Sequence, residues 1–259
     1  MGDRLTAESS PNHHTTVETL WLASRPVHPD DPLDALVDRV LATTAGTRVL
    51  TVAGPVAVGK STIAAALAER IRARDATVAV IATDGFLWPN AVLEARDLVA
   101  RKGFPETYDL DRLDELVADT RDGVSPLAVP VYSHQRYDVL DVPIELERPD
   151  VLVVEGVVAL QRRFGDLGVY VDADLADVEH WYVTRFQGLV TAAEDDPDSF
   201  YRGWVDLDAD AVADLARAVW SGVNLPNLVE HIAPTRARAD VVLHKGPDHA
   251  IREVTWAQP

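Results

Sequence analysis

The stretch GPVAVGKST, Gly54 to Thr62, decides the fold class because it matches the phosphate-loop pattern G-x-x-x-x-G-K-S/T at every fixed position. It lies between a strand-like apolar run, TRVLTVAG, and a helix-like run, KSTIAAALAERIRAR. In such a loop, backbone N–H groups surround phosphate oxygens, Lys60 adds positive charge and Ser61 can ligate Mg²⁺. We therefore predict binding of a nucleoside triphosphate rather than an empty glycine-rich turn. The residues predicted to contact it are Gly54, Val56, Ala57, Val58, Gly59, Lys60, Ser61 and Thr62.

The rest of the chain alternates between strand-like and helix-like patterns. Strands are expected at 47–54, 77–84, 151–156, 167–174 and 239–245. Helices are expected at 31–45, 60–74, 91–101, 111–121, 175–193 and within 209–232. This alternation predicts the α/β class, with a mainly parallel central sheet flanked by helices in three layers. Without repeats or linkers we expect a single domain over 1–259, with residues 1–16 as a loose tail.

Composition narrows the partners and the location. The chain has 24 basic and 42 acidic residues, a net charge of −18. That balance disfavours nonspecific binding to nucleic acid and to anionic membranes. Because there is no cysteine and no apolar run long enough for a membrane span or signal peptide, we expect a cytoplasmic protein. Lysine is so rare that each position is informative; the lysines are Lys60, Lys102 and Lys245.

Two acidic residues stand at or near the ends of further strand-like runs. Glu155 ends the run VLVVE, and Asp84 lies in IATDGFLWPN. Since the carboxyl ends of parallel strands share one edge of a sheet, both are expected beside the phosphate loop. Glu155 would lie near the metal ion, or cap a turn. Asp84 would accept a proton from an attacking hydroxyl, or be a solvated turn residue; the first reading indicates a small-molecule kinase.

Longer blocks of sequence extend beyond these motifs. They are TDGFLWPNAVLEARDLVARKGFPETYD, VPVYSHQRYDV, PDVLVVEGVVALQ, VYVDAD, WYVTRF, DPDSFY and NLPNLVEHIAPTRARADVVLHK. In these blocks the chain resembles the type I (bacterial) pantothenate kinases, which belong to the phosphoribulokinase/uridine kinase branch of P-loop kinases. The block that begins at Thr83 is the most specific, because other kinases of the branch diverge there.

The resemblance implies a three-layer P-loop kinase fold, ATP and Mg²⁺ as cofactors, pantothenate as the phosphoryl acceptor and a homodimer. It implies Asp84 as the catalytic base, with Lys60 and Arg185 stabilising charge on the phosphoryl group and Ser61 and Glu155 near the metal. Taken singly, a histidine or a helical tyrosine is more often a structural residue than a ligand. By resemblance, however, the pantothenate-contacting residues would be Asp84, Tyr132, His134, Tyr137, Tyr182 and Asn224, and His249 would lie near the adenine.

The chain departs from the family pattern before the phosphate loop, where it is shorter than in typical members, and at further positions that leave alternatives open. The segment 161–168 is shortened, and Leu189 replaces an expected aromatic residue, so the acceptor could instead be a nucleoside, a sugar or a specialised metabolite. Ala65 stands where the family commonly has an arginine that contacts inhibitory coenzyme A, which predicts weakened feedback inhibition because alanine cannot pair with a phosphate. A nucleotide-binding regulatory protein without transfer activity is a further alternative, although such a protein would be expected to lack Asp84 or Arg185.

Overall fold

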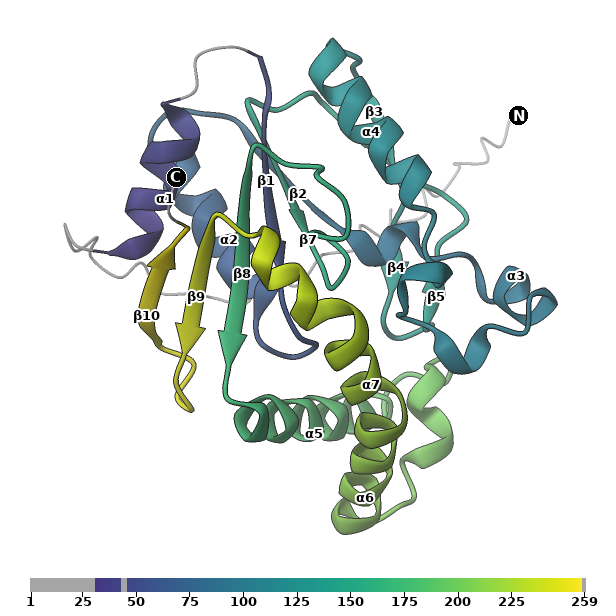
Figure 1. The fold of residues 1–259 in the computed structure, drawn as a ribbon. Helices are drawn as coiled ribbons and strands as arrows, with labels where there is room; N and C mark the ends of the chain where they lie inside the picture. Colours follow the sequence, from purple (N-terminus) through teal and green to yellow (C-terminus); the bar gives the residue numbers. More distant parts are fainter. Residues whose placement is uncertain (1–30, 43–45, 258–259) are drawn as a thin grey trace, which may run out of the picture.

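A six-stranded sheet in the order β10-β9-β8-β1-β7-β2 forms the centre of the molecule (Figure 1). The computed structural model describes residues 31–42 and 46–257, so the predicted tail at 1–16 lies outside the described residues. β10 pairs antiparallel with β9, and the other pairings in the sheet are parallel. The predicted α/β fold with a mainly parallel sheet is therefore confirmed. The strands of this sheet are β1 (Arg48–Ala53), β2 (Val78–Ala82), β7 (Val151–Glu155), β8 (Leu167–Ala173), β9 (Val241–Lys245) and β10 (Ile251–Trp256).

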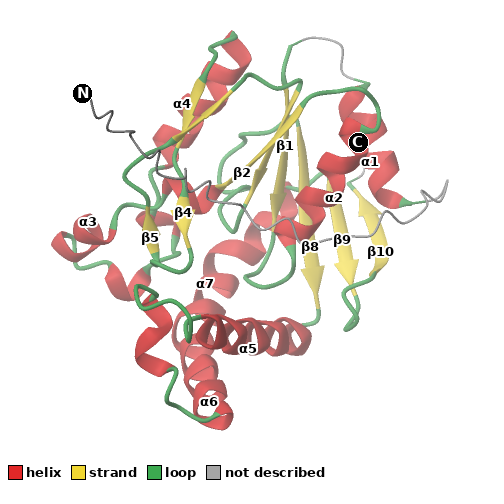
Figure 2. Ribbon diagram, turned by 180° about the vertical axis from the view of Figure 1, so that it is seen from behind, coloured by secondary structure: helices red, strands yellow, loops and turns green. Residues whose placement is uncertain are grey.

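Helices cover both faces of this sheet, because each central strand is apolar on both sides. Leu50 on β1 belongs to one buried cluster together with Leu67 of one helix layer, whereas its neighbour Val49 belongs to a second cluster together with Leu113 of the other layer. The first layer contains α1 and α2, which lie toward the viewer in Figure 2, and the second contains α4. Near-continuous burial of this kind is typical of parallel strands. The helices are α1 (Pro32–Leu41), α2 (Lys60–Arg72), α3 (Asn90–Ala95), α4 (Leu110–Asp122), α5 (Leu175–Ala192), α6 (Ala209–Val219) and α7 (Leu225–Asn227).

The carboxyl edge of the sheet collects the residues singled out in the sequence. Glu155, the last residue of β7, is in register with Val52 on β1 and with Ala82 on β2. The phosphate loop leaves β1 at this edge, and the segment carrying Asp84 leaves β2 there. Beyond the ends of the strands, α5 and α6 pack against each other through a separate apolar cluster (Figure 1). The edge is therefore enclosed by helices that do not cover the faces of the sheet.

Two expected elements end earlier than their patterns indicate. The predicted strand at 77–84 stops at Ala82, and Thr83–Phe86 forms a 3₁₀ turn, so Asp84 stands two residues beyond the strand. The predicted helix at 91–101 is α3 followed by a short 3₁₀ turn at Val99–Arg101. Asp97 interrupts it with a left-handed backbone (φ 57°), which an α-helix does not accommodate.

Some elements have no counterpart in the sequence-based prediction. They are the edge strand β10 and two small antiparallel pairs, in which β3 (Leu127–Val129) pairs with β6 (Ile144–Leu146) and β4 (Tyr132–Ser133) pairs with β5 (Asp138–Val139). Between α6 and the end of the helical region, π-helical turns at Trp220–Asn224 and Leu228–Ile232 flank the short α7. π-Helical turns are rare in proteins, and those that occur are often found at functional sites.

Candidate active site

The phosphate loop has the backbone that its glycines allow. Gly54 (φ 147°) and Gly59 (φ 90°) occupy regions that side chains disfavour. A Cβ on Gly54 would lie 2.3 Å from the carbonyl oxygen of Val171, so no larger residue fits there. Gly59 is the N-cap of α2, which leaves the first N–H groups of that helix available to an anion. The predicted loop is thus formed as its pattern indicates.

Lys60 is the first residue of α2, and its ammonium is buried at this loop. Its Nζ donates a hydrogen bond to the carbonyl oxygen of Pro55 at 2.7 Å. Burial lowers the pKa of Lys60 to about 8, and the carboxylates of Glu155 and Asp84 partly offset this. Because an ammonium carries three donors, further hydrogen bonds to phosphate oxygens remain open to it.

Ser61 and Glu155 form a pair suited to a divalent cation. Ser61 Oγ donates to Glu155 Oε1 at 2.8 Å, across the gap between α2 and the end of β7. Burial raises the pKa of Glu155, and the nearby charge of Lys60 opposes that rise. Among residues 31–42 and 46–257, no cluster of three or more acidic or histidine side chains could hold a metal by itself. The pair therefore fits Mg²⁺, which keeps water ligands and is shared with substrate phosphates.

Asp84 is fixed in its 3₁₀ turn from both sides. A Cβ on the next residue, Gly85, would lie 2.3 Å from the carbonyl oxygen of Pro130, so the turn packs directly on the backbone. The hydroxyl of the buried Tyr108 donates to Asp84 Oδ1 at 3.2 Å. Asp84 itself is half-buried and faces the same cavity as Lys60. The carboxylate is thus held at the sheet edge but remains open to a ligand.

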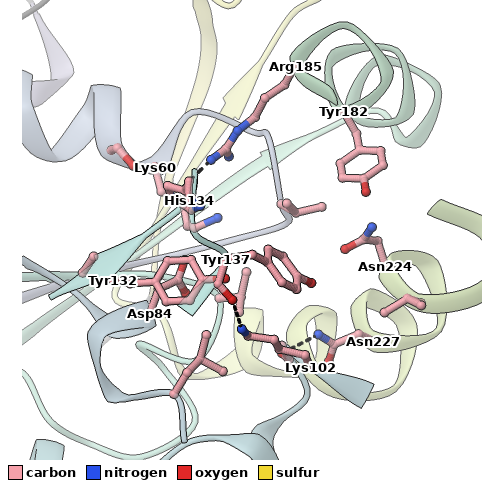
Figure 3. A pocket seen from close by; sticks show the side chains of 18 of the residues that line it. Lys60, Asp84, Lys102, Tyr132, His134, Tyr137, Tyr182, Arg185, Asn224 and Asn227 are labelled. Carbon is pink, nitrogen blue, oxygen red and sulfur yellow. Dashed lines mark hydrogen bonds between the residues drawn. The ribbon is translucent and has the colours of Figure 1, made fainter. Parts of the chain in front are cut away.

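A cavity of about 220 Å³ lies between the sheet edge, the β4–β5 pair, α5 and the π-helical turns (Figure 3). It brings the phosphate-loop lysine, the acidic residues and the predicted acceptor wall into one space. The residues singled out in the sequence that line it are Val56, Lys60, Ser61, Asp84, Tyr132, His134, Tyr137, Glu155, Tyr182, Arg185, Leu189 and Asn224.

One wall of this cavity is the β4–β5 pair, which carries three polar rings. The rings of Tyr132 and His134 meet edge to face at 5.2 Å, and Tyr137 approaches Tyr132 at 6.3 Å. Arg185, from α5, lies 3.4 Å from His134 Nε2 through its Nη2. Burial and the adjacent guanidinium lower the pKa of His134. The imidazole is therefore kept neutral and can accept from Arg185.

The opposite wall combines two polar side chains with an apolar floor. Figure 3 shows the Tyr182 hydroxyl facing the Asn224 amide. Burial raises the pKa of Tyr182 to about 12, an effect that the Asn224 side chain reduces. Apolar lining comes from Phe186, Leu189, Val219, Val223 and Ile232. The cavity can thus accept a ligand with hydroxyl and amide groups at one end and aliphatic groups at the other.

Comparison with known proteins identifies the family. The Phosphoribulokinase / Uridine kinase family pattern matches residues 49–186. A pantothenate kinase from Sorangium cellulosum is 47% identical over 220 residues, which cover 80% of this chain and 71% of that protein. One from Cutibacterium acnes is 43% identical over 223 residues, covering 80% and 68%. The chain belongs to the pantothenate kinase branch of this family.

A solved structure supports the fold independently of close sequence similarity. The D-glycerate 3-kinase from Cryptococcus neoformans superposes with a TM-score of 0.57 at 13% identity, covering 87% of this chain and 96% of that chain. The shared architecture is that of a P-loop kinase fold, and family membership makes this chain a small-molecule kinase.

Several cavity residues were not predicted from the sequence, and the main one is Lys102. Its side chain is 8% exposed, and its Nζ donates to Asn90 Oδ1 at 2.6 Å and to the carbonyl oxygen of Tyr137 at 2.5 Å. Burial lowers the pKa of Lys102 to about 8, partly offset by Asp138 and Asp84. The rarity of lysine was the signal that could have found it. The others include Tyr108, Tyr201 and Asn227.

His249 lies outside the cavity lining. Its ring stacks on Trp181 at 4.0 Å in the turn between β9 and β10. Burial and the charge of Lys245 lower the pKa of His249. A neutral ring of this kind can stack with a purine base. That His249 lies near the adenine stays a prediction. The same holds for nucleotide contacts by the remaining loop residues, Gly54, Ala57, Val58, Gly59 and Thr62, which form the loop but do not line the cavity.

Proposed function

We propose that this chain transfers the γ-phosphoryl group of ATP to the primary hydroxyl of pantothenate and forms 4'-phosphopantothenate, the first step of coenzyme A biosynthesis. The observation that carries the proposal is the shared cavity of Lys60, Asp84 and Arg185, with the polar rings opposite them. Membership of the pantothenate kinase branch, with 40–47% identity to its relatives, supports the choice of acceptor.

The chemistry follows from the charges around the cavity. Asp84 accepts the proton of the attacking hydroxyl, and Tyr108 holds one carboxylate oxygen so that the other faces the acceptor. Lys60 and Arg185 stabilise the negative charge that develops on the transferred phosphoryl oxygens. Ser61 and Glu155 would hold Mg²⁺, which neutralises phosphate charge when it is bound.

The acceptor wall matches the functional groups of pantothenate. Its two hydroxyls and its amide need both donors and acceptors, which Tyr132, His134, Tyr137, Tyr182 and Asn224 supply. The aliphatic part of the molecule would face the apolar floor. A mixed wall of this kind suits a substrate that carries hydroxyl, amide and carboxylate groups together.

The alternative acceptors have less support. Every lining residue lies outside the shortened segment 161–168, so the shortening does not directly reshape the cavity wall. Leu189 does line it, and it remains the reason to test other alcohols. The regulatory alternative lacks a specific observation in its favour, since Asp84 and Arg185 both line the cavity.

Other expectations stay predictions. Among the described residues, each helix is too short or too polar to cross a bilayer. We propose, as before, one domain, a cytoplasmic location, a homodimer and the absence of nucleic-acid or membrane partners.

The deciding experiment measures ADP release with pantothenate, pantothenate analogues, uridine, cytidine, D-glycerate and small sugars, and identifies products by mass. Turnover with pantothenate at least tenfold above every other alcohol class is expected. Turnover with another acceptor but not with pantothenate would overturn the acceptor and leave the kinase class standing. ADP release that no acceptor stimulates would contradict transfer altogether.

A further inference from the structure

The third lysine of the chain has no role in the mechanism above. Lys245 is the last residue of β9 and is only 3% exposed. Lysine is almost never buried to this degree unless its charge is paired. Because Lys60 and Lys102 both line the cavity, the burial of Lys245 calls for a physical reason of its own.

The ammonium of Lys245 lies directly against the phosphate loop. Its Nζ donates a hydrogen bond to the carbonyl oxygen of Val58 at 2.9 Å. A Cβ on Gly59 would lie only 2.7 Å from the same Nζ. The charge therefore sits at the N-terminus of α2, one residue from Lys60 along the loop. The hydrogen bond to this ammonium holds the carbonyl group of Val58 in place. The carbonyl oxygen therefore cannot turn toward a bound phosphate, which it would repel.

This ammonium has no carboxylate partner within the described part of the chain. The ion pairs found there all involve arginine or histidine. Its other neighbours are the Trp181 ring at 5.6 Å and His249, whose own pKa it lowers. Burial alone lowers the pKa of Lys245. A buried positive charge without a counter-ion is unfavourable until an anion arrives.

We propose that Lys245 is a positioning residue of the triphosphate site, which holds the Val58–Gly59 segment and supplies a second positive charge behind the phosphate loop. The bound triphosphate is its missing counter-ion. The inference rests on the proposed function only in that ATP binds at this loop, and it does not depend on the identity of the acceptor. It also gives the late strand β9 a role in nucleotide binding.

The experiment compares binding of ATP, ADP and adenosine to wild type and Lys245→Met by calorimetry, with Mg²⁺ and without acceptor. The loss of affinity should be on the order of tenfold for ATP, smaller for ADP and under about twofold for adenosine. Val241→Ala is the matched control, because it removes buried volume on the same strand without removing charge. Equal losses for ATP and adenosine, or an ATP affinity unchanged in Lys245→Met, would overturn the proposal.

A second measurement on wild type covers the case in which the variant does not fold. Because the chain has only three lysines, labelling with lysine carrying ¹³C at Cε gives a spectrum simple enough to assign with Lys60→Met and Lys102→Met. The pKa of Lys245 should rise when ATP binds and rise less with adenosine. A Lys245 titration that ATP leaves unchanged would overturn the role. Neither measurement uses a phosphoryl acceptor. Both therefore test the role of Lys245 independently of whether the protein phosphorylates pantothenate.

Discussion

The hydroxyl of Tyr108 donates to Asp84 Oδ1 at 3.2 Å, and this hydrogen bond joins two distant parts of the active-site wall. Tyr108 precedes α4 and is 6% exposed, whereas Asp84 follows β2. Burial raises the pKa of Tyr108 well above its ordinary value, an effect that the carboxylate of Asp84 increases. The phenol therefore stays protonated and acts as a donor throughout the working pH range. It fixes the orientation of the proposed base without competing for the substrate proton.

Replacing Tyr108 with phenylalanine should lower kcat while leaving ATP affinity unchanged. The ring remains buried, but Asp84 loses the donor that orients it, so we expect kcat to fall by roughly 5–30-fold. Steady-state kinetics and a separate ATP titration measure the two effects. Tyr170→Phe serves as the control, since this buried tyrosine on β8 does not line the cavity. A normal kcat in Tyr108→Phe would show that orientation of Asp84 is set elsewhere.

Asp84→Asn should bind ATP and turn over slowly. Asparagine keeps an acceptor for the Tyr108 hydroxyl but cannot take the proton of the acceptor alcohol. Turnover should drop by roughly 10²–10⁴-fold, as expected for loss of a general base. ADP release and calorimetry with ATP test the two statements on one protein preparation. Turnover near that of wild type would refute the assignment of Asp84 as the base.

Coenzyme A should inhibit this protein weakly. Ala65 is exposed on α2, and its methyl group cannot pair with a phosphate. An assay at rising coenzyme A concentrations, run with wild type and Ala65→Arg, measures the effect. We expect stronger inhibition of the arginine variant, by on the order of tenfold in the inhibition constant. Strong inhibition of wild type at micromolar coenzyme A would contradict the hypothesis.

Nucleotide affinity should fall as the pH rises through about 8. Burial lowers the pKa of Lys60 to about 8 in the folded protein without ligand, so its charge is lost there. The free energy of unfolding changes in the opposite direction to ATP affinity. Between about pH 8 and 10 the unfolded chain binds more protons at this lysine than the folded chain does, so raising the pH favours the folded state. Titrating Lys60 therefore increases the free energy of unfolding in that range while ATP binding weakens. ATP titrations at several pH values, with AMP as the weakly charged reference, check this; a flat ATP affinity from about pH 7 to 9.5 would contradict it.

The sheet edge and the phosphate-loop side of the site could be predicted because their signals are local, whereas the acceptor wall and Arg185 were assigned by resemblance. The phosphate loop is contiguous, and Glu155 directly ends an apolar strand, so parallel topology was enough to place them together. β10 was missed because Ile251–Trp256 is an edge strand with charged and exposed positions, which weakens its apolar pattern. The β4–β5 pair has two-residue strands, too short for any periodic signal.

The cavity residues that were missed depend on tertiary structure. Tyr108 reaches Asp84 because two loops are brought together: Asp109 donates its backbone N–H to the carbonyl oxygen of Phe86, and Trp88 donates to that of Thr107. Lys102 reaches the site because α3 and the following turn fold back on the β4–β5 pair, as its bond to Tyr137 shows. Neither contact follows from spacing along the chain. The resemblance was most specific in the block that begins at Thr83, but within that block it assigned a role only to Asp84.

Lys102 should matter for the acceptor and not for the nucleotide. Tyr137 has a left-handed backbone (φ 52°), which is unfavourable for a tyrosine. Its carbonyl oxygen accepts from Lys102 Nζ and, at 3.0 Å, from Asn90 Nδ2, and these bonds hold the turn that presents the three rings. Lys102→Met removes the charged donor and leaves a buried chain of similar length.

The KM for pantothenate should therefore rise by on the order of tenfold, with the KM for ATP within about twofold of wild type. Asn90→Ala is the matched variant. It removes the neutral donor from the same carbonyl and one acceptor of the Lys102 ammonium, but it leaves the bond from Lys102 to Tyr137, so it should change the same constant by less. Separate substrate titrations measure both constants. Equal increases in the two KM values would indicate a general loss of structure, and an unchanged pantothenate KM would show that the turn keeps its shape without Lys102.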